Sequence, residues 1–237
     1  MSDPTVFAHR GCPARGPENT VAAFRRAAAR VPAVELDARR CGSGELVVFH
    51  DDTLDRLLGL DGRVAETSLD RLQSRGVLDS DERVPTLSTA LAAIPDDVTV
   101  NVELKETGIA DGVARAVAAV DNEVLVSSFS RTALSEYAAV ADDPRAFVTV
   151  PDEWESAVET AADDGCVALH PQYETLFVGD DDRVETARRR IETAHDHGLA
   201  VNVWTIRSPD PVADLRAAGV DGLIADDWAD AGVSDEG

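Results

Sequence analysis

Polar side chains that could carry out acid/base or metal chemistry recur beside short apolar segments in the first half of the chain. In chain order they are His9, Arg10, Glu35, Asp37, His50, Glu103 and Lys105. Glu35 and Asp37 are two residues apart, as are Glu103 and Lys105, and residues at this spacing point to the same face of a β-strand. Each pair would therefore present both of its side chains on one side of its strand.

Glu35, Asp37 and Glu103 are three carboxylates contributed by two expected strands. Three such charges close together would force at least one carboxyl group to hold a proton unless a cation neutralised them. Carboxylate oxygens suit Mg²⁺ and Ca²⁺, whereas zinc sites usually draw on more histidine or cysteine. We therefore expect these residues to bind one divalent cation, Mg²⁺ or Ca²⁺.

Two histidines and two basic side chains accompany the carboxylates. His9 and His50, each at a strand end, suit proton transfer near neutral pH: one imidazole takes a proton from the nucleophile and the other gives one to the departing alkoxide. Arg10 can hold phosphate oxygens in a bidentate fork, and Lys105 can do so as a point charge. Together with a divalent cation, this set describes phosphoryl transfer to water or to an alcohol.

The elements that must position these residues alternate between short strands and helices. Eight apolar or β-branched segments are expected to be strands: Thr5–His9, Val34–Ala38, Val98–Leu104, Val124–Phe129, Ala146–Val150, Cys166–His170, Ala200–Ile206 and Gly222–Asp226, with an extra short strand at Glu45–His50. Helical patterns include Thr20–Val31, Ile109–Val120, Ser130–Ala141, Asp182–His197 and a last helix from Pro209 to about Gly219. This order is typical of parallel strands joined by helical crossovers.

Eight β/α units in 237 residues favour an α/β fold with a single (β/α)8 TIM barrel. An open doubly wound sheet is disfavoured because no G-x-G-x-x-G follows the first strand. We expect one domain over residues 1–237, a small insertion at about 51–85 that overhangs the barrel mouth, and a frayed tail at Val233–Gly237. Because active sites of this fold lie at the C-terminal ends of the strands, the polar residues above are expected to meet at the mouth.

The charge balance is strongly acidic. Asp and Glu outnumber Lys and Arg by 45 to 22, the formal net charge is −23, and Lys105 is the only lysine. Such a surface repels nucleic-acid phosphates and anionic lipid headgroups, so we expect neither nucleic-acid binding nor stable membrane association. The composition also indicates a halophilic protein, because at about 1 M salt the Debye length shrinks to roughly 3 Å and self-repulsion is screened.

Cysteine usage and the N-terminus bear on the compartment. Cys12, Cys41 and Cys166 form no C-x-x-C pair, which argues against both a disulfide framework and a zinc site. The start, Met-Ser-Asp-Pro-Thr, lacks the features of a secretory signal, and no apolar run approaches the roughly 18 residues of a membrane span. We therefore expect a soluble, cytoplasmic protein of undetermined oligomeric state.

An ordered series of short motifs runs through nearly the whole chain. They are His9-Arg10-Gly11, Pro17-Glu18-Asn19-Thr20, Val34-Glu35-Leu36-Asp37, Leu46-Val47-Val48-Phe49-His50-Asp51 with Thr53-Leu54-Asp55-Arg56, Pro85-Thr86-Leu87, Val102-Glu103-Leu104-Lys105, Ser128-Phe129, Val203-Trp204-Thr205 and Gly219-Val220-Asp221-Gly222-Leu223-Ile224. The set resembles the glycerophosphodiester phosphodiesterase family. The first two motifs alone are weak, whereas the ordered set is highly specific.

The resemblance implies an enzyme that hydrolyses small-molecule glycerophosphodiesters to glycerol phosphate and an alcohol. It implies that His9 and His50 are the acid/base pair. It also implies that Glu35, Asp37 and Glu103 are the metal ligands, and that Arg10 and Lys105 bind the phosphate. Residues 51–85 would correspond to the family's small insertion, near the expected glycerol end of the substrate. We take His9 as the base and His50 as the acid; whether water or a glycerol hydroxyl attacks stays open.

Other residues keep a structural interpretation or two interpretations. His170, at a strand end, either contacts substrate or is a satisfied structural histidine. Trp204, which we place among the substrate-binding residues, either closes the barrel mouth or packs against an alkyl group. His195 and His197 lie near a helix C-terminus on different faces and are expected to be structural, and Asp226 is expected to cap or brace a loop.

Two loops depart from the family's pattern. Arg40-Cys41-Gly42-Ser43-Gly44 stands where relatives usually carry a threonine and an Asp-Gly turn, and Ala225-Asp226-Asp227-Trp228 stands where Thr-Asp often precedes proline. These changes leave the expected ligands intact and bear on substrate preference more than on reaction type. Two rival functions also stay open: a phospholipase-like lyase that acts on intact lipids, and a catalytically silent protein that binds phosphodiesters.

Overall fold

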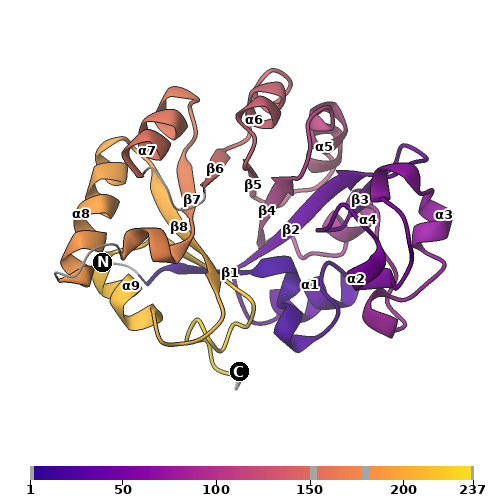
Figure 1. Cartoon of the computed structure of the whole chain (residues 1–237), viewed down its shortest axis with the longest axis horizontal. Helices are drawn as coiled ribbons and strands as arrows, with labels where there is room; N and C mark the ends of the chain where they lie inside the picture. Colours follow the sequence, from indigo (N-terminus) through magenta and orange to yellow (C-terminus); the bar gives the residue numbers. More distant parts are fainter. Residues whose placement is uncertain (1–2, 150–153, 178–181, 236–237) are drawn as a thin grey trace.

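A computed structural model describes residues 3–149, 154–177 and 182–235. In this part of the chain, nine strands form one sheet in the order β1-β9-β8-β7-β6-β5-β4-β2-β3, and a β1–β2 pairing closes eight of them into a barrel. The barrel strands are parallel, whereas β3 pairs antiparallel with β2 outside the barrel. Helices surround the strands (Figure 1). The predicted (β/α)8 TIM barrel is thus confirmed.

The bounds of the elements are as follows. The strands are β1 (Thr5–Ala8), β2 (Ala33–Arg40), β3 (Leu46–Val48), β4 (Thr99–Leu104), β5 (Val124–Ser128), β6 (Arg145–Thr149), β7 (Ala168–Pro171), β8 (Ala200–Ile206) and β9 (Gly222–Ala225). The α-helices are α1 (Val21–Ala28), α2 (Asp55–Leu58), α3 (Leu69–Leu72), α4 (Leu87–Leu91), α5 (Ala110–Val117), α6 (Arg131–Ala138), α7 (Trp154–Asp163), α8 (Arg183–Asp196) and α9 (Val212–Ala218). Short 3-10 turns are η1 (His9–Gly11), η2 (Pro13–Arg15), η3 (Val64–Glu66), η4 (Val77–Asp79) and η5 (Tyr173–Leu176).

Each expected barrel strand is present, with small shifts at the ends. His9 lies just beyond β1 in the turn η1, β7 begins at Ala168 instead of Cys166, and Val150 lies outside the described residues. The expected cap of α6 is confirmed, because Ser130 Oγ accepts a hydrogen bond from the Ala133 amide at 3.2 Å. No helix in the described ranges combines the length and the apolar character that a bilayer crossing needs.

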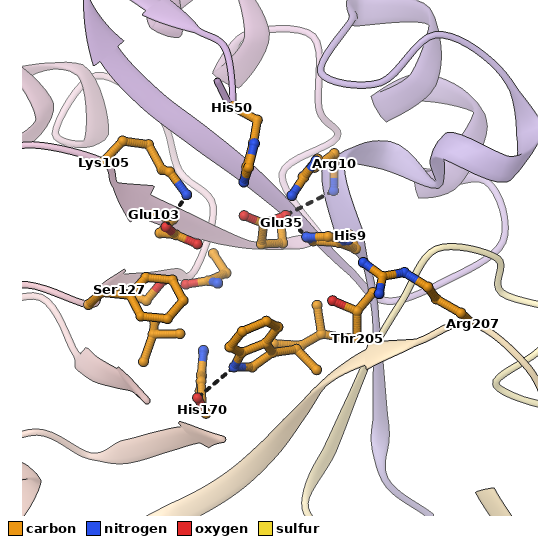
Figure 2. Close-up of a pocket in the computed structure, with 15 residues that line it drawn as sticks. His9, Arg10, Glu35, His50, Glu103, Lys105, Ser127, His170, Thr205 and Arg207 are labelled. Atoms are coloured by element: carbon orange, nitrogen blue, oxygen red, sulfur yellow. Dashed lines mark hydrogen bonds and ion pairs between the residues drawn. The ribbon is translucent and has the colours of Figure 1, made fainter. Parts of the chain in front are cut away.

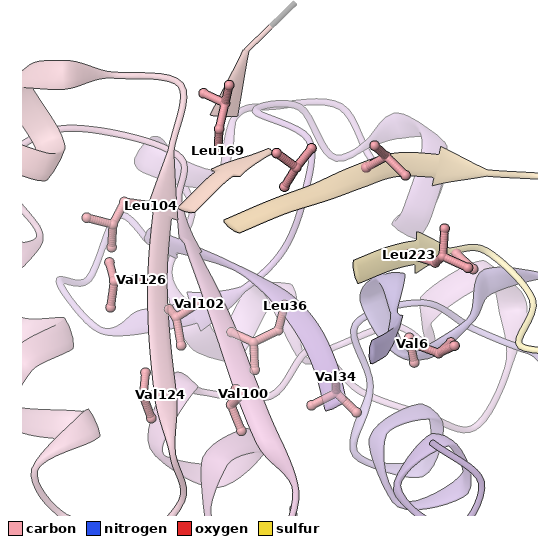
Figure 3. Packing of buried hydrophobic residues seen from close by; sticks show 14 of the residues in the cluster. Val6, Val34, Leu36, Val100, Val102, Leu104, Val124, Val126, Leu169 and Leu223 are labelled. Carbon is pink, nitrogen blue, oxygen red and sulfur yellow. The ribbon is translucent and has the colours of Figure 1, made fainter. Parts of the chain in front are cut away.

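Alternation along the strands separates the core from the site. In β4, Val100, Val102 and Leu104 are almost fully buried in the main apolar cluster (Figure 3), where strand side chains pack beneath the surrounding helices. The residues between them, Asn101 and Glu103, line a cavity at the barrel mouth. One face of the strand therefore stabilises the barrel, while the other supplies polar groups to its interior.

The segment 51–85 contains α2, η3, α3 and η4 and packs beside β3 (Figure 1). Its own apolar cluster includes Leu54, Leu57, Leu72 and Val84 together with Phe49, whose amide donates to the Asp37 carbonyl of β2 at 2.9 Å. The segment is thus attached to the strand that leads to His50.

The described part of the expected C-terminal tail is anchored. The Val233 amide donates to the Trp228 carbonyl at 3.0 Å, and Asp235 accepts from Trp228 Nε1 at 2.8 Å. Asp235 also pairs with Arg15 at 3.2 Å. Residues 236–237 lie outside the described ranges, and the expected fraying of the tail stays a prediction.

Candidate active site

A cavity of about 90 Å³ lies at the C-terminal ends of the barrel strands (Figure 2). Seven of the eight expected site residues line it, namely His9, Arg10, Glu35, His50, Glu103, Lys105 and Trp204. The eighth, Asp37, lies in the same carboxylate cluster as Glu35 and Glu103. Residues that are far apart in sequence therefore meet at one mouth, as the fold predicts.

The carboxylate cluster has the geometry of a cation site. One oxygen each from Glu35, Asp37 and Glu103 lies within 4.8 Å of the others, and the β2–β4 register places Asp37 directly beside Glu103. Glu35 and Asp37 are 3% and 1% exposed, so water cannot stabilise their charges. Glu35 Oε1 has no hydrogen-bond partner among the described residues. This all-oxygen donor set fits a hard divalent cation.

The three carboxyl groups differ in their affinity for protons. Burial raises the pKa of Glu35 well above its ordinary value, and the charges of Asp37 and Glu103 raise it further. The pKa of Glu103 is also raised, first by burial and then by Asp37. Burial opposes ionisation of Asp37 as well, but the positive charges of Lys105 and Arg10 hold its pKa below the ordinary range. The protein alone therefore stabilises one ionised carboxylate much better than three.

Arg10 and Lys105 form close contacts with the carboxylates of this cluster. The Arg10 amide donates to Glu35 Oε2 at 2.9 Å, and its guanidinium lies 3.5 Å from Asp37. Lys105 Nζ lies 2.6 Å from Glu103 and 3.4 Å from Asp37. Burial disfavours the charged form of Lys105, but the carboxylates outweigh this effect and raise its pKa. Both side chains are therefore cationic and directed at the cavity.

The turn that presents Arg10 depends on a glycine. Gly11 has φ +76°, and a Cβ atom there would lie 2.7 Å from Ala23 Cβ in α1. Arg10 itself has φ 51°, an uncommon conformation for a residue other than glycine. A tight turn against α1 thus directs the Arg10 amide and side chain back toward β2.

The two histidines, which follow β1 and β3, converge beside Glu35 (Figure 2). His9 Nδ1 lies 2.5 Å from Asp226 Oδ1, and His50 Nδ1 lies 2.7 Å from Asp51 Oδ1. In both cases an aspartate occupies Nδ1 and leaves Nε2 for the cavity; His9 Nε2 is 4.0 Å from Glu35. Burial lowers the pKa of both imidazoles. Both imidazoles thus present Nε2 for proton transfer, and His9 has the neutral form that a proton acceptor needs.

An arginine from the 51–85 segment links these parts. Arg56 in α2 makes a bidentate pair with Asp51, at 2.6 and 3.0 Å, and a second one with Glu18, at 2.8 Å for both contacts. Glu18 also accepts from Arg10 Nη1 at 3.1 Å. A continuous chain of contacts therefore runs from His50 through Asp51, Arg56 and Glu18 to Arg10.

Comparison with known proteins identifies the family. The family model described as the glycerophosphoryl diester phosphodiesterase family matches residues 9–229. The chain belongs to this family. It is therefore a phosphoric diester hydrolase. A glycerophosphodiester phosphodiesterase from Caldanaerobacter subterraneus subsp. tengcongensis is 30% identical over 241 residues, which cover 94% of this chain and 93% of that protein.

Solved structures of the glycerophosphoryl diester phosphodiesterase family share the fold. A glycerophosphodiester phosphodiesterase from Thermotoga maritima has a TM-score of 0.81 at 28% identity, covering 95% of this chain and 96% of that chain. A phosphodiesterase from Oleispira antarctica, solved in complex with the product sn-glycerol-3-phosphate, has a TM-score of 0.80 at 27% identity, covering 94% and 93%.

Several cavity residues were not expected as site residues from the sequence. They are Asn101, Ser127, Phe129, Val148, Thr205, Arg207 and Ile224. Asn101 precedes Glu103 by two residues on β4, so strand alternation could have placed it on the same inward face. No comparable sequence signal identifies Arg207, which follows the end of β8.

Asp226 and His170 each have a further contact with the site besides the roles that the sequence suggested. The Asp226 main chain bonds Ala14 and Ile206, as expected for a loop brace, but its carboxylate contacts His9. His170 is 1% exposed, lines the cavity, and its carbonyl accepts from Trp204 Nε1 at 2.8 Å.

The remaining histidines lie away from the cavity. His195 is within 2.8 Å of Asp221, and His197 bonds the Thr193 carbonyl at the end of α8. Neither lines the cavity, which agrees with the structural role expected for them.

Proposed function

We propose that this phosphoric diester hydrolase converts glycerophosphodiesters to glycerol phosphate and an alcohol, with a divalent cation and with His9 and His50 as the acid/base pair. The observation that carries the proposal is the convergence of the two imidazoles on the carboxylate cluster, each with an aspartate at Nδ1. The Oleispira phosphodiesterase, solved in complex with the product sn-glycerol-3-phosphate, supports the same product here.

The metal ligands are proposed to be Glu35, Asp37 and Glu103. Their oxygens lie close together, and Glu35 Oε1 has no protein partner within the described ranges. Mg²⁺ or Ca²⁺ held there would neutralise the cluster and polarise the phosphoryl group toward attack.

The remaining residues act on the substrate directly. Arg10 and Lys105 exchange part of their carboxylate contacts for the phosphate oxygens and hold the diester in place. His9 takes a proton from the attacking hydroxyl at Nε2, and Asp226 stabilises the resulting imidazolium. His50, protonated at both ring nitrogens and paired with Asp51, delivers its Nε2 proton to the leaving oxygen. Trp204 packs against Phe129 with ring centroids 5.5 Å apart and forms an apolar wall for the bound substrate.

We also propose that residues 1–237 act as one catalytic domain, with the 51–85 segment as its insertion, in a cytoplasm of high salt. The single barrel and the family match over 9–229 support the first part. The net charge of −23 supports the second, since salt screens such a surface.

The test is release of glycerol phosphate from a panel of glycerophosphodiesters in molar KCl, with Mg²⁺, with Ca²⁺ and with a chelator. We expect release that requires the cation and is lost in both His9→Ala and His50→Ala. Analysis for cyclic phosphate in the same samples separates attack by water from attack by a glycerol hydroxyl. Folded protein that releases nothing in any metal, or histidine variants with wild-type turnover, would overturn the proposal.

A further inference from the structure

The motif Pro17-Glu18-Asn19-Thr20 lies between the turn η2 and the helix α1. Thr20 caps this helix, because its Oγ1 accepts a hydrogen bond from the Ala23 amide at 3.2 Å. Asn19, directly before the cap, neither lines the cavity nor belongs to the carboxylate cluster. Any part that Asn19 plays in the reaction must therefore act through another residue.

Asn19 joins two parts of the site. Its Nδ2 atom donates a hydrogen bond to Asp37 Oδ2 at 2.7 Å, and its backbone amide donates to the Arg10 carbonyl at 2.9 Å. Asn19 and Asp37 are 2% and 1% exposed, so bulk water does not compete for the contact between their side chains. The orientation of a proposed cation ligand thus depends on an asparagine that lies outside the cavity.

Two basic side chains also contact Asp37. Lys105 Nζ lies 3.4 Å from Asp37 Oδ1, and Arg10 Nε lies 3.5 Å from Asp37 Oδ2. Both side chains line the cavity and are proposed to turn toward the phosphate when substrate binds. Asn19 is neutral and does not line the cavity, so its bond to Asp37 persists while the two basic side chains exchange partners. The asparagine can therefore hold Asp37 both before and after substrate binds.

Two features of Asn19 cost stability. Its backbone has φ 56°, a left-handed conformation that is uncommon for residues other than glycine. Its Oδ1 atom is buried and forms no hydrogen bond with any described residue. A buried acceptor without a partner is costly, and strained backbone of this kind is concentrated at functional sites. These costs indicate that Asn19 serves the site as well as the fold.

We infer that Asn19 is a positioning residue for the cation site, which keeps the Asp37 carboxylate directed at Glu35 and Glu103. This inference rests on the proposed function and on its assignment of the three cation ligands. A hydrogen bond to the outer side of a ligand fixes the orientation of that ligand, and loss of such a bond typically weakens metal binding by about 10- to 100-fold. Asn19 acts on the cation site in this way, through Asp37 and without touching the substrate.

The experiment replaces Asn19 by glycine, which removes the side-chain amide and accepts a positive φ without strain. Calorimetry on protein prepared without divalent ions measures the binding of Mg²⁺ and of Ca²⁺ directly. We expect Asn19→Gly to bind each cation about 10- to 100-fold more weakly than the wild type does. The cation concentration that gives half-maximal glycerol phosphate release should rise by the same factor, and kcat at saturating cation should approach that of the wild type.

The matched control is Asn122→Ala. Asn122 Nδ2 donates to the Pro95 and Val98 carbonyls at 2.7 and 2.9 Å, and its Oδ1 atom is also buried without a partner among the described residues. Because this residue precedes β5 at the opposite end of the barrel, its loss should lower the thermal midpoint and leave the cation affinity unchanged.

A second variant, Asn19→Ser, decides the question if Asn19→Gly does not fold. Serine keeps a Cβ atom and a polar group at this position, but its side chain is too short to make the 2.7 Å contact with Asp37. We therefore expect the same loss of cation affinity in Asn19→Ser.

The outcomes separate this inference from the proposed function. Wild-type cation affinity in folded Asn19→Gly or Asn19→Ser, or an equal loss of affinity in Asn122→Ala, would overturn the positioning role and leave the proposed ligands in place. Wild-type protein that binds neither Mg²⁺ nor Ca²⁺ would overturn the ligand assignment and the role of Asn19 with it.

Discussion

Replacing Asp226 by asparagine tests whether this carboxylate positions His9 for catalysis. Asp226 Oδ1 lies 2.5 Å from His9 Nδ1, and Asp226 Oδ2 accepts from Arg207 Nε at 2.9 Å. Asparagine has nearly the same shape but no charge, and its amide group cannot serve both contacts as an acceptor. The variant therefore keeps the packing and removes the charge that stabilises the His9 imidazolium.

The expected loss follows from the contact that is removed. A hydrogen bond to a charged group contributes about 1.5–3 kcal/mol, and about 1.4 kcal/mol corresponds to a factor of ten in rate. We therefore expect kcat to fall about 10- to 150-fold in Asp226→Asn. Such a fall alone does not separate a positioning role from a structural one.

The pH profile supplies that distinction. Burial lowers the pKa of His9, while Asp226 and Asp37 raise it and Arg10 lowers it; Glu35 also faces the ring at 4.0 Å. Removal of the Asp226 charge lowers the pKa of His9 further. Because a base works in its neutral form, the acidic limb of kcat/KM should move to lower pH.

The assay is glycerol phosphate release across the neutral pH range at fixed metal and salt. Asp227→Asn is the matched control, since Asp227 is the adjacent aspartate, pairs with Arg15 at 2.9 Å and does not line the cavity. We expect it to keep wild-type turnover and an unshifted profile. Turnover of Asp226→Asn equal to that of the control, or an acidic limb that moves to higher pH, would refute the reasoning.

Three further changes test other parts of the site. Asp37→Asn should weaken Mg²⁺ or Ca²⁺ binding by about 100-fold in calorimetry, while Asp52→Asn, whose carboxylate pairs with Arg63 outside the cluster, should not. Equal affinities would contradict the ligand assignment. Arg56→Lys cannot keep two bidentate pairs, so kcat should fall about tenfold with little change in thermal midpoint, and wild-type kcat would show that the Arg56 contacts are dispensable. The thermal midpoint should rise as KCl increases from about 0.1 M to 1 M, where the Debye length falls from roughly 10 to 3 Å; no rise would contradict the halophilic interpretation.

The barrel could be predicted because the sequence signals for its strands and helices are local. Each strand is a short apolar run, and helix caps such as Ser130 lie between them, so periodicity and capping locate most elements. The site residues could be predicted because the fold brings all strand ends to one mouth. Glu35, Asp37 and Glu103 could be placed at the mouth once the strand that contains each residue and its position in that strand were known.

The unpredicted parts depend on contacts between distant segments. Asp226 meets His9 across 217 positions in the chain, and nothing in the local sequence distinguishes a loop-bracing aspartate from one that orients a histidine. Arg56 likewise bonds Glu18 from a segment whose packing is set by its own apolar cluster. Asn101 and Ser127 were not predicted because a lone asparagine or serine in a strand carries little information. Only the structure shows that both line one cavity and that Asn101 Oδ1 and Ser127 Oγ bond no other described residue.

The charges around the site give an independent reason to expect a cation. The linked network contains five carboxylates and three basic side chains, an excess of two negative charges when all are ionised: Glu18, Glu35, Asp37, Asp51 and Glu103 against Arg10, Arg56 and Lys105. A phosphodiester anion would add to that excess in a buried, low-dielectric setting, where like charges repel strongly. One divalent cation at the proposed site would cancel the excess, so that Arg10 and Lys105 could turn from the carboxylates to the phosphate. We therefore expect the protein without a cation to bind an anionic substrate poorly.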